Sequence, residues 1–250
     1  MRQLLPTPID DVDPDELYAA DARPAPAGRP WVLTNMIASA DGAASIDGLS
    51  GQLGGPGDRA VFRALRAVAD VILVGAGTVR AENYQPSKPS IDQQARRAAR
   101  GQAPVPRIAV VTGRLDLDLS GPLFTDSPDR PLVLTGTRPS PEQLARASDV
   151  AEVIVAGADT VDLAAGLTAL AGTGAGVVLC EGGPTLNGQL LAADLIDEAC
   201  LTIAPVLAGG AASRIMHGSP LDQAQRLRLD RVLEQDGLLL LRYVRVSVGV

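Results

Sequence analysis

Four short apolar runs of this sequence end in the same way, and they constrain the fold more than any other feature. The runs are VILVGAGT, IAVVTGR, LVLTGT and VVLCEGGPT, and glycine or threonine punctuates the end of each. Such runs indicate buried strands of a parallel sheet. Ligands of open α/β sheets bind at the carboxyl ends of the strands, where glycine lets a ligand approach the backbone closely. The repeated pattern favours a long anionic cofactor, such as a dinucleotide, over simple strand termination.

The order of the predicted elements indicates a single α/β domain. Strand-like and helix-like segments alternate from the strand WVLTNMIAS onward. The last segment, RLRLDRVLEQDGLLLLRYVRVSV, instead predicts an antiparallel C-terminal hairpin, because Asp-Gly between apolar runs is a strong hairpin signal. We therefore expect a mixed, mostly parallel sheet flanked by helices on both faces. Residues 1–30 are expected to form an N-terminal arm with a helical turn or two at DPDELYAA, and residues 31–250 the domain.

Composition excludes several classes of function. Hydrophobic residues make up 46% of the 250 residues but aromatic residues only 2%, so that Ala, Val and Leu must build the core. A net charge of −7 disfavours binding to nucleic acid. The single His217 and the widely spaced Cys180 and Cys200 exclude a structural zinc site, and each cysteine is expected to be a buried thiol. Without a membrane-spanning apolar segment or a signal pattern, we expect a cytoplasmic protein with no metal centre.

The stretch CEGGPTLNGQLL is the most specific of the four strand ends. Gly183 is expected at the N-cap of a helix and Pro184 at its first position, where a missing N–H costs nothing. Gly182 and Gly183 leave room for a pyrophosphate at the free N–H groups of that helix. Glu181 then lies beside the ligand. It either binds substrate or, alternatively, caps a backbone amide or pairs with an arginine.

A second carboxylate stands out in the segment PGDRAVFRALRAVA. Its apolar residues recur at helical spacing, with Pro56 at the start. Asp58 falls inside the apolar stripe, as expected either of a partner for the helix dipole or of a group that faces a ligand. In the second case burial raises its pKa toward that of a general acid. Arg66 of the same helix either meets a substrate phosphate or lies on the surface.

Three segments together resemble the pyrimidine reductase family, the reductase domain of bacterial riboflavin biosynthesis. They are NMIASADGAASIDGLSG, FRALRAVADVILVGAGTVRAEN and LCEGGPTLNGQLL, in the family's order and spacing. The resemblance extends from about residue 31 to residue 246. It implies a dihydrofolate reductase-like fold, an NADPH-dependent oxidoreductase and a homodimer, for which the apolar C-terminal hairpin offers a surface.

The resemblance also implies roles for individual residues. Ser50, Arg66 and Glu181 correspond to substrate-binding positions. Asp58 and Glu181 are the catalytic candidates, with Asp58 expected to orient or protonate the substrate. The predicted cofactor-binding residues are Ile37, Gln52, Thr78, Glu82, Thr112, Gly113, Gly182, Gly183, Pro184, Thr185 and Leu186. Arg114 and Arg138 follow strand ends and are candidates for the 2′-phosphate of the cofactor.

Two departures from the family pattern affect the expected substrate. After GTVRAEN the family has an arginine that binds the substrate phosphate, whereas this chain reads YQPSKPS. Lys88 is the candidate replacement, although lysine is a point charge rather than a planar fork. The HxE and PCxxC signatures of the deaminase domain that often precedes the reductase do not occur in the sequence, so we expect reductase activity alone.

The leading hypothesis is an NADPH-dependent reductase that opens the ribosyl group of an aminopyrimidine ribosyl phosphate to a ribityl chain. Reduction of a pterin such as dihydrofolate is the first alternative, with Asp58 holding the aminopyrimidine edge of the ring. An NADPH-binding protein without turnover is the second. All three hypotheses have small molecules as ligands, and we expect neither nucleic acid nor a membrane as a partner.

Overall fold

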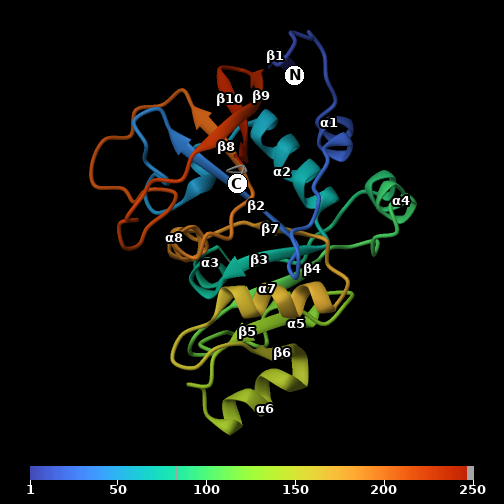
Figure 1. Ribbon diagram of the computed structural model, residues 1–250, viewed down its shortest axis with the longest axis vertical. Coiled ribbons are helices and arrows are strands. Elements are labelled where there is room, and N and C mark those ends of the chain that lie inside the picture. Colours follow the sequence, from blue (N-terminus) through green and yellow to red (C-terminus); the bar gives the residue numbers. More distant parts are fainter. Residues whose placement is uncertain (83, 247–250) are drawn as a thin grey trace.

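The computed structural model describes residues 1–82 and 84–246, and their strands form one ten-stranded sheet in the order β1-β9-β10-β8-β2-β7-β3-β4-β5-β6 (Figure 1). The strands are β1 (Arg2–Leu5), β2 (Trp31–Ser39), β3 (Val71–Gly75), β4 (Arg107–Val111), β5 (Leu132–Thr135), β6 (Glu152–Val155), β7 (Val177–Cys180), β8 (Glu198–Ala204), β9 (Leu227–Gln235) and β10 (Leu238–Arg245). The helices are α1 (Pro14–Ala20), α2 (Pro56–Val68), α3 (Ala76–Ala81), α4 (Ile91–Ala99), α5 (Pro122–Thr125), α6 (Pro141–Val150), α7 (Leu163–Gly172) and α8 (Pro184–Ala192), with a 3-10 turn η1 (Ser50–Gln52). Residues 247–250, the end of the expected domain, lie outside the described residues.

The sheet is mixed and mostly parallel, as predicted. The strands from β8 to β6 in the sheet order pair in parallel, and β10, β9 and β1 continue the sheet in antiparallel pairs. The predicted hairpin joins β9 to β10, and its turn residues Asp236 and Gly237 have φ values of 53° and 82°, as a tight hairpin requires. In the arm, the expected helical turns form α1, capped by Asp13. The short strand β1 is not predicted, because four residues without alternation give no strand signal.

Helices cover both faces of the parallel strands, and side-chain alternation divides the interior into two cores. Ile72 of β3 packs in one core with Leu65 of α2. The next residue, Leu73, packs in the other core with Leu167 of α7. Both cores are largely aliphatic, as the low aromatic content requires. None of the described helices is long and apolar enough to cross a membrane.

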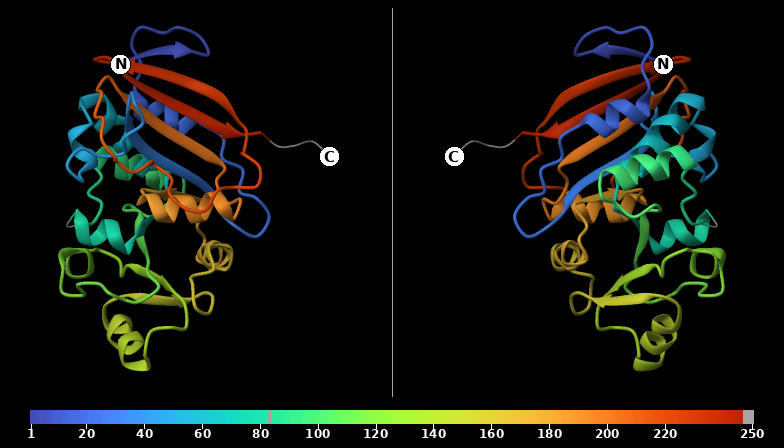
Figure 2. Two further views of the ribbon diagram at one scale, coloured as in Figure 1. Left: turned by 90° about the vertical axis from the view of Figure 1, so that its left-hand side faces the viewer. Right: turned by 90° about the vertical axis from the view of Figure 1, so that its right-hand side faces the viewer.

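The C-terminal hairpin has one covered face and one partly open face. Helix α1 lies against one face of β9 and β10 (Figure 2), where Leu233 and Leu240 are buried in the core. On the opposite face, Leu229 and Leu239 are 36% and 38% exposed. Each face of the hairpin thus carries apolar side chains, but only one of them is buried within the chain.

Helix α4 differs from the polar surface helix that its sequence predicts. Arg97 is fully buried, and its Nη1 donates to the carbonyl oxygens of Ala67 and Ala69 at 3.0 and 2.6 Å. The last carbonyl groups of a helix have no partner within it, so Arg97 satisfies the C-terminal end of α2. The sequence pattern misses this contact because an arginine in a polar helix resembles a solvated one. Arg97 therefore fixes the helix that carries Asp58 and Arg66.

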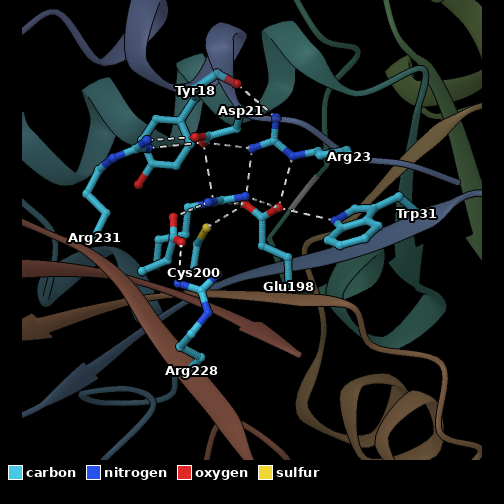
Figure 3. Close-up of polar contacts among 10 residues, drawn as sticks. Tyr18, Asp21, Arg23, Trp31, Glu198, Cys200, Arg228 and Arg231 are labelled. Carbon is cyan, nitrogen blue, oxygen red and sulfur yellow. Dashed lines mark hydrogen bonds and ion pairs between the residues drawn. The ribbon is translucent and has the colours of Figure 1, made fainter. Parts of the chain in front are cut away.

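A buried ion network attaches the N-terminal arm to the antiparallel strands (Figure 3). At its centre, the fully buried Glu198 accepts two hydrogen bonds from Arg242 and two from Arg23, at 2.8 to 3.1 Å. Trp31 Nε1 donates a fifth at 3.2 Å. Burial alone would raise the pKa of Glu198, but the two guanidinium groups outweigh burial and hold the pKa below its ordinary value of 4.5.

Asp21 extends this network to β9. Its carboxylate accepts hydrogen bonds from Arg231 at 2.6 and 3.0 Å, and it lies 3.4 Å from Arg23 Nη2. Asp21 of the arm thus pairs with Arg231 of the sheet, and Arg23 of the arm pairs with Glu198 of the sheet. The arm is held by these ion pairs and by the buried Tyr18 of α1.

Replacing Glu198 with glutamine is expected to lower the free energy of unfolding by about 3–5 kcal/mol, because buried arginines lose their carboxylate. The loss depends on pH, since the pKa of Glu198 is lower in the folded protein than in the unfolded one. Its contribution is complete above the ordinary pKa of 4.5 and is lost as the pH falls through the folded value. Urea unfolding of both proteins between about pH 7 and pH 3 measures this difference, which should shrink in acid.

Glu152→Gln is the matched control, because it removes an ion pair with Arg107 that is largely open to solvent. Its cost is expected to be about 1 kcal/mol or less. Equal losses for the two variants would contradict the stabilising role of the buried network.

Candidate active-site groove

Three adjoining cavities form a groove at the carboxyl ends of the parallel strands. The inner cavity, of about 370 Å³, lies against α2 and the end of β7. The middle cavity, of about 340 Å³, lies at the start of α8, and the outer cavity, of about 510 Å³, lies beyond β4 and β5. Glu181 and Thr78 line both the inner and the middle cavity, and Thr185 lines both the middle and the outer one. The groove occupies the edge of the sheet at which a ligand is expected.

The middle cavity lies between the ends of β3 and β7. The segment after β3 is not the loop that the sequence suggests but the short helix α3, which places Thr78 on the cavity wall. On the other side, Gly183 is the N-cap of α8 and Pro184 its first residue, as predicted. Leu186 and Leu190 anchor α8 in the core with exposures of 4% and 0%. The N–H groups of the first turn therefore point toward a cavity, an arrangement that suits an anion.

Close packing explains the glycines at this point. The Gly75 N–H donates to the Gly182 carbonyl oxygen at 2.7 Å, which joins the ends of β3 and β7. Gly182 has a φ of 94°, a conformation that favours glycine. A Cβ atom on Gly183 would lie 2.8 Å from Thr78 Oγ1. Gly183 lines the middle cavity together with Thr78, so a side chain at this position would collide with the opposite wall.

Glu181 and Arg66 form a two-pronged ion pair in the inner cavity. Arg66 Nε and Nη2 each donate to one carboxylate oxygen of Glu181 at 2.6 Å. The Tyr84 hydroxyl donates to the same carboxylate, and the Arg66 guanidinium lies 4.3 Å from the centroid of the Phe62 ring. Glu181 therefore pairs with an arginine, which is one of its alternatives, and both side chains line the cavity, where binding of a substrate stays a prediction.

The electrostatics of this cluster keep both Arg66 and Tyr84 protonated. Burial alone would lower the pKa of Arg66, but the Glu181 carboxylate outweighs burial and raises it above its ordinary value. Burial and the Glu181 carboxylate raise the pKa of Tyr84 well above its ordinary value of 10.0. Tyr84 is therefore a permanent hydrogen-bond donor to Glu181 at neutral pH.

Asp58 faces the inner cavity from the first turn of α2. Its Oδ1 accepts a hydrogen bond from Thr202 Oγ1 of β8 at 2.7 Å. Burial raises the pKa of Asp58, against the opposing effects of this hydrogen bond and of the charge on Arg59. Asp58 lies in the first helical turn and also lines the cavity, and its contact with a ligand stays a prediction.

The outer cavity carries three arginines. Arg80 is engaged by Asp116, whose backbone oxygen accepts from Arg80 Nη1 at 2.7 Å and whose carboxylate lies 3.6 Å away. Arg114 and Arg138 also line this cavity, and neither has an acidic group within 4.0 Å among residues 1–82 and 84–246. Two cations are therefore available to an anionic ligand.

Most of the predicted site residues meet in this groove. Those that line one or more of its cavities are Ile37, Ser50, Asp58, Arg66, Thr78, Glu82, Thr112, Gly113, Glu181, Gly183, Pro184, Thr185 and Leu186. Gln52 is exposed at the end of η1 and is not among the described residues of the cavity walls. Lys88 lines a separate cavity of about 80 Å³ with Arg63, on the other side of Phe62.

Sequence patterns do not point to Tyr84, Phe62 or Thr202. Tyr84 lies in a polar stretch after α3, and Phe62 lies in the apolar stripe of α2 like a core residue. Thr202 lies in β8, and threonine is a common residue in strands, so that nothing in the sequence distinguishes it. The scarcity of aromatic residues is the one signal that could have drawn attention to Tyr84 and Phe62.

Comparison with known proteins agrees with the geometry of the groove. The sequence model described as the RibD C-terminal domain matches residues 30–240. The 2,5-diamino-6-ribosylamino-4(3H)-pyrimidinone 5′-phosphate reductase of Methanothermobacter thermautotrophicus is 33% identical over 206 residues, which cover 81% of this chain and 91% of that protein. The riboflavin biosynthesis protein RibD of Mycobacterium tuberculosis is 30% identical over 220 residues, which cover 87% of this chain and 55% of that protein.

A solved structure extends the likeness to the fold. The pyrimidine reductase-like protein of Corynebacterium diphtheriae superposes with a TM-score of 0.83 at 30% identity, covering 94% of this chain and 100% of that one. The match includes the parallel strands and the antiparallel end of the sheet, because it spans nearly the whole chain. The resemblance carried by the three sequence motifs is confirmed, and the chain belongs to the family of the RibD C-terminal domain, the pyrimidine reductases of riboflavin biosynthesis.

Proposed function

We propose that this protein reduces the ribosyl group of an aminopyrimidine ribosyl phosphate to a ribityl chain, with NADPH as the reductant. The observation that carries the proposal is the inner cavity, where Glu181, Arg66 and Asp58 meet at one end of the groove. Relatives named as reductases of a ribosylamino-pyrimidinone phosphate support the same substrate class. The reaction is an oxidoreduction of riboflavin biosynthesis.

The middle and outer cavities fit a nicotinamide cofactor. The start of α8 offers free N–H groups to a pyrophosphate, beside glycines that leave the backbone open. Arg114 and Arg138 suit the 2′-phosphate that distinguishes NADPH from NADH, because guanidinium groups bind phosphate with two parallel hydrogen bonds. Bound in this way, the cofactor supplies a hydride to C1′ of the substrate.

The residues of the inner cavity then hold the substrate in place. Reduction breaks the bond from C1′ to the ring oxygen of the ribosyl group, that oxygen takes up a proton, and C1′ gains a hydrogen. Glu181 keeps a fixed position because Arg66 and Tyr84 hold its carboxylate. Asp58 orients or protonates the substrate: burial raises its pKa, and the hydrogen bond from Thr202 opposes that rise. The protein contributes alignment, which accounts for much of the rate enhancement in such reactions.

Pterin reduction is the second candidate function. The observation that favours it is the same Asp58, a partly buried carboxylate with a threonine partner, since the ring of a pterin also presents an aminopyrimidine edge. Arg59 and Arg66 line the inner cavity, and Lys88 lines the smaller cavity that shares Phe62 and Arg66 with it, so all three are candidates to hold a substrate phosphate. A substrate without phosphate would need none of them.

We also propose that two copies of the chain pair through the open face of the C-terminal hairpin. Leu229 and Leu239 are partly exposed there, and a second copy offers the same apolar strands in a self-complementary arrangement. Sedimentation equilibrium of the wild type and of Leu239→Glu decides the point. A wild-type monomer would exclude the dimer.

Steady-state oxidation of NADPH tests the proposed function. We expect turnover with the aminopyrimidine ribosyl phosphate, and a ribityl product by mass spectrometry. Turnover with dihydrofolate alone would favour pterin reduction. Binding of NADPH without oxidation, for every pyrimidine and pterin supplied, would indicate a protein that binds the cofactor and does not use it.

Arg66→Ala is expected to raise KM for the pyrimidine by about 10- to 100-fold and to change KM for NADPH far less. The reason is that Glu181 loses the guanidinium that fixes it beside the substrate. Arg63→Ala, an exposed arginine of the same helix, is the control. Equal increases of both KM values would contradict a role for Arg66 at the substrate.

The double variant Arg114→Ala/Arg138→Ala is expected to raise KM for NADPH by about tenfold or more, because each charge-assisted hydrogen bond contributes about 1.5–3 kcal/mol. KM for NADH should stay nearly constant, since NADH has no 2′-phosphate. Arg146→Ala, an exposed arginine of α6 outside the outer cavity, controls for the loss of positive charge. A parallel rise in KM for NADH would mean that these arginines do not read the 2′-phosphate.

A further inference from the structure

We infer that Tyr84 is a positioning residue of the reaction, whose hydroxyl group fixes the Arg66 guanidinium and the Glu181 carboxylate in one array. The inference rests on the proposed function and deepens it, because it concerns the residue that holds the substrate-binding pair in place. The array of these three side chains also determines which atoms of the pair stay free for a substrate. No motif of the sequence points to this tyrosine.

The three side chains form a closed triangle of hydrogen bonds. The Tyr84 hydroxyl donates to Glu181 Oε2, and its oxygen accepts a hydrogen bond from Arg66 Nη2 at 3.0 Å. The same Arg66 Nη2 donates to Glu181 Oε2 at 2.6 Å. Each member of the array therefore contacts the other two. In such a network the loss of one member weakens the bonds between the others.

Tyr84 is the member of the array whose own position is fixed by packing. It is 9% exposed and packs in the same core as Leu65 of α2. Its backbone N–H group donates to the Val79 carbonyl oxygen of α3 at 3.3 Å. A tyrosine side chain has two torsions, so little entropy is lost when it is held. The longer side chains of Arg66 and Glu181 lose more entropy and depend more on a fixed partner.

The array joins three elements around the groove. Arg66 belongs to α2, Glu181 follows β7, and Tyr84 follows α3. Without the tyrosine hydroxyl, the ion pair would connect only α2 and the end of β7. Helix α3 carries Thr78 on the wall of the middle cavity, so the hydroxyl also connects that wall with the inner cavity.

The hydrogen bonds within the array determine what is left for a ligand. A guanidinium group has five N–H donors, one on Nε and two on each terminal nitrogen. Arg66 uses Nε for Glu181 and Nη2 for Glu181 and Tyr84, and its Nη1 has no partner among the residues that the structure describes. Glu181 Oε2 accepts two hydrogen bonds and Oε1 accepts one. The donors of Nη1 and the second lone pair of Oε1 therefore remain for the substrate.

Tyr84→Phe tests the inference, because it keeps the ring in the core and removes only the hydroxyl group. Steady-state oxidation of NADPH is the measurement. KM for the aminopyrimidine ribosyl phosphate is expected to rise by about tenfold, and KM for NADPH by less than about twofold. Tyr18→Phe is the matched control, because Tyr18 is 1% exposed and lies outside the groove. Neither KM is expected to change in the control.

A double-mutant cycle separates positioning from a merely structural role. Glu181→Gln replaces one acceptor oxygen with an N–H group that faces the donors of the array and so breaks it. Adding Tyr84→Phe to this variant should therefore change kcat/KM by about twofold or less. An equal loss from Tyr84→Phe in both backgrounds, or an unchanged KM for the pyrimidine in Tyr84→Phe, would overturn the inference. Calorimetric binding of the pyrimidine replaces kcat/KM in the cycle where turnover is too slow to measure.

Arg66→Lys provides a second variant, and it carries the test if Tyr84→Phe does not fold. A lysine keeps the positive charge beside Glu181 but has no planar fork that reaches the tyrosine at the same time. We expect KM for the pyrimidine to rise about as much as in Tyr84→Phe, and an unchanged KM would contradict the inference while leaving the proposed function intact. A wild type without turnover of the pyrimidine would refute the proposed function, and the inference with it. Thermal unfolding and NADPH binding show that each variant is folded.

Discussion

The hydrogen bond between Gly75 and Gly182 is the constraint on which the groove depends. It joins the ends of β3 and β7, which lie side by side in the sheet, and so brings α3 and α8 to opposite walls of one cavity. The residue before Gly182 is Glu181, whose backbone continues the pairing with β3. The start of α8 and the Glu181 carboxylate are therefore positioned by the same few backbone contacts. A ligand that uses both must lie across this point.

Glu198 and Glu181 are both held by a two-pronged arginine, and their surroundings differ. Glu198 is enclosed by the arm and the antiparallel strands, and it receives five hydrogen bonds from Arg23, Arg242 and Trp31 and a sixth from Cys200 Sγ. Glu181 makes a similar pair with Arg66 but lies against a cavity of about 370 Å³. The first ion pair connects parts of the fold, and the second lies on the wall of the groove. The two ion pairs have the same chemistry, and they differ in whether the carboxylate can be reached from the groove.

Features that depend on local spacing are predictable from this sequence, and features that depend on distant contacts are not. The strand ends, the cap of α8 and the unusual position of Asp58 in its helix follow from neighbouring residues. The partner of Asp58 does not, because Thr202 lies 144 positions away, and Tyr84 lies 97 positions from Glu181. The buried Arg97 is missed for the same reason, since its acceptors belong to another helix. Sequence therefore identifies the acids of the site, while the fold supplies the groups that hold them.

The ion network of the arm extends beyond the part of the chain that the family model matches. The family match begins at residue 30, after both Arg23 and Asp21. A polypeptide cut at that boundary would keep Glu198, Arg242 and Arg231 in the interior but lose two of the charges that neutralise them. The stretch before the match therefore supplies charges that the buried network needs, as a bound ion does in other proteins. A relative with a different N-terminal stretch would need different charged residues on the strands that face it.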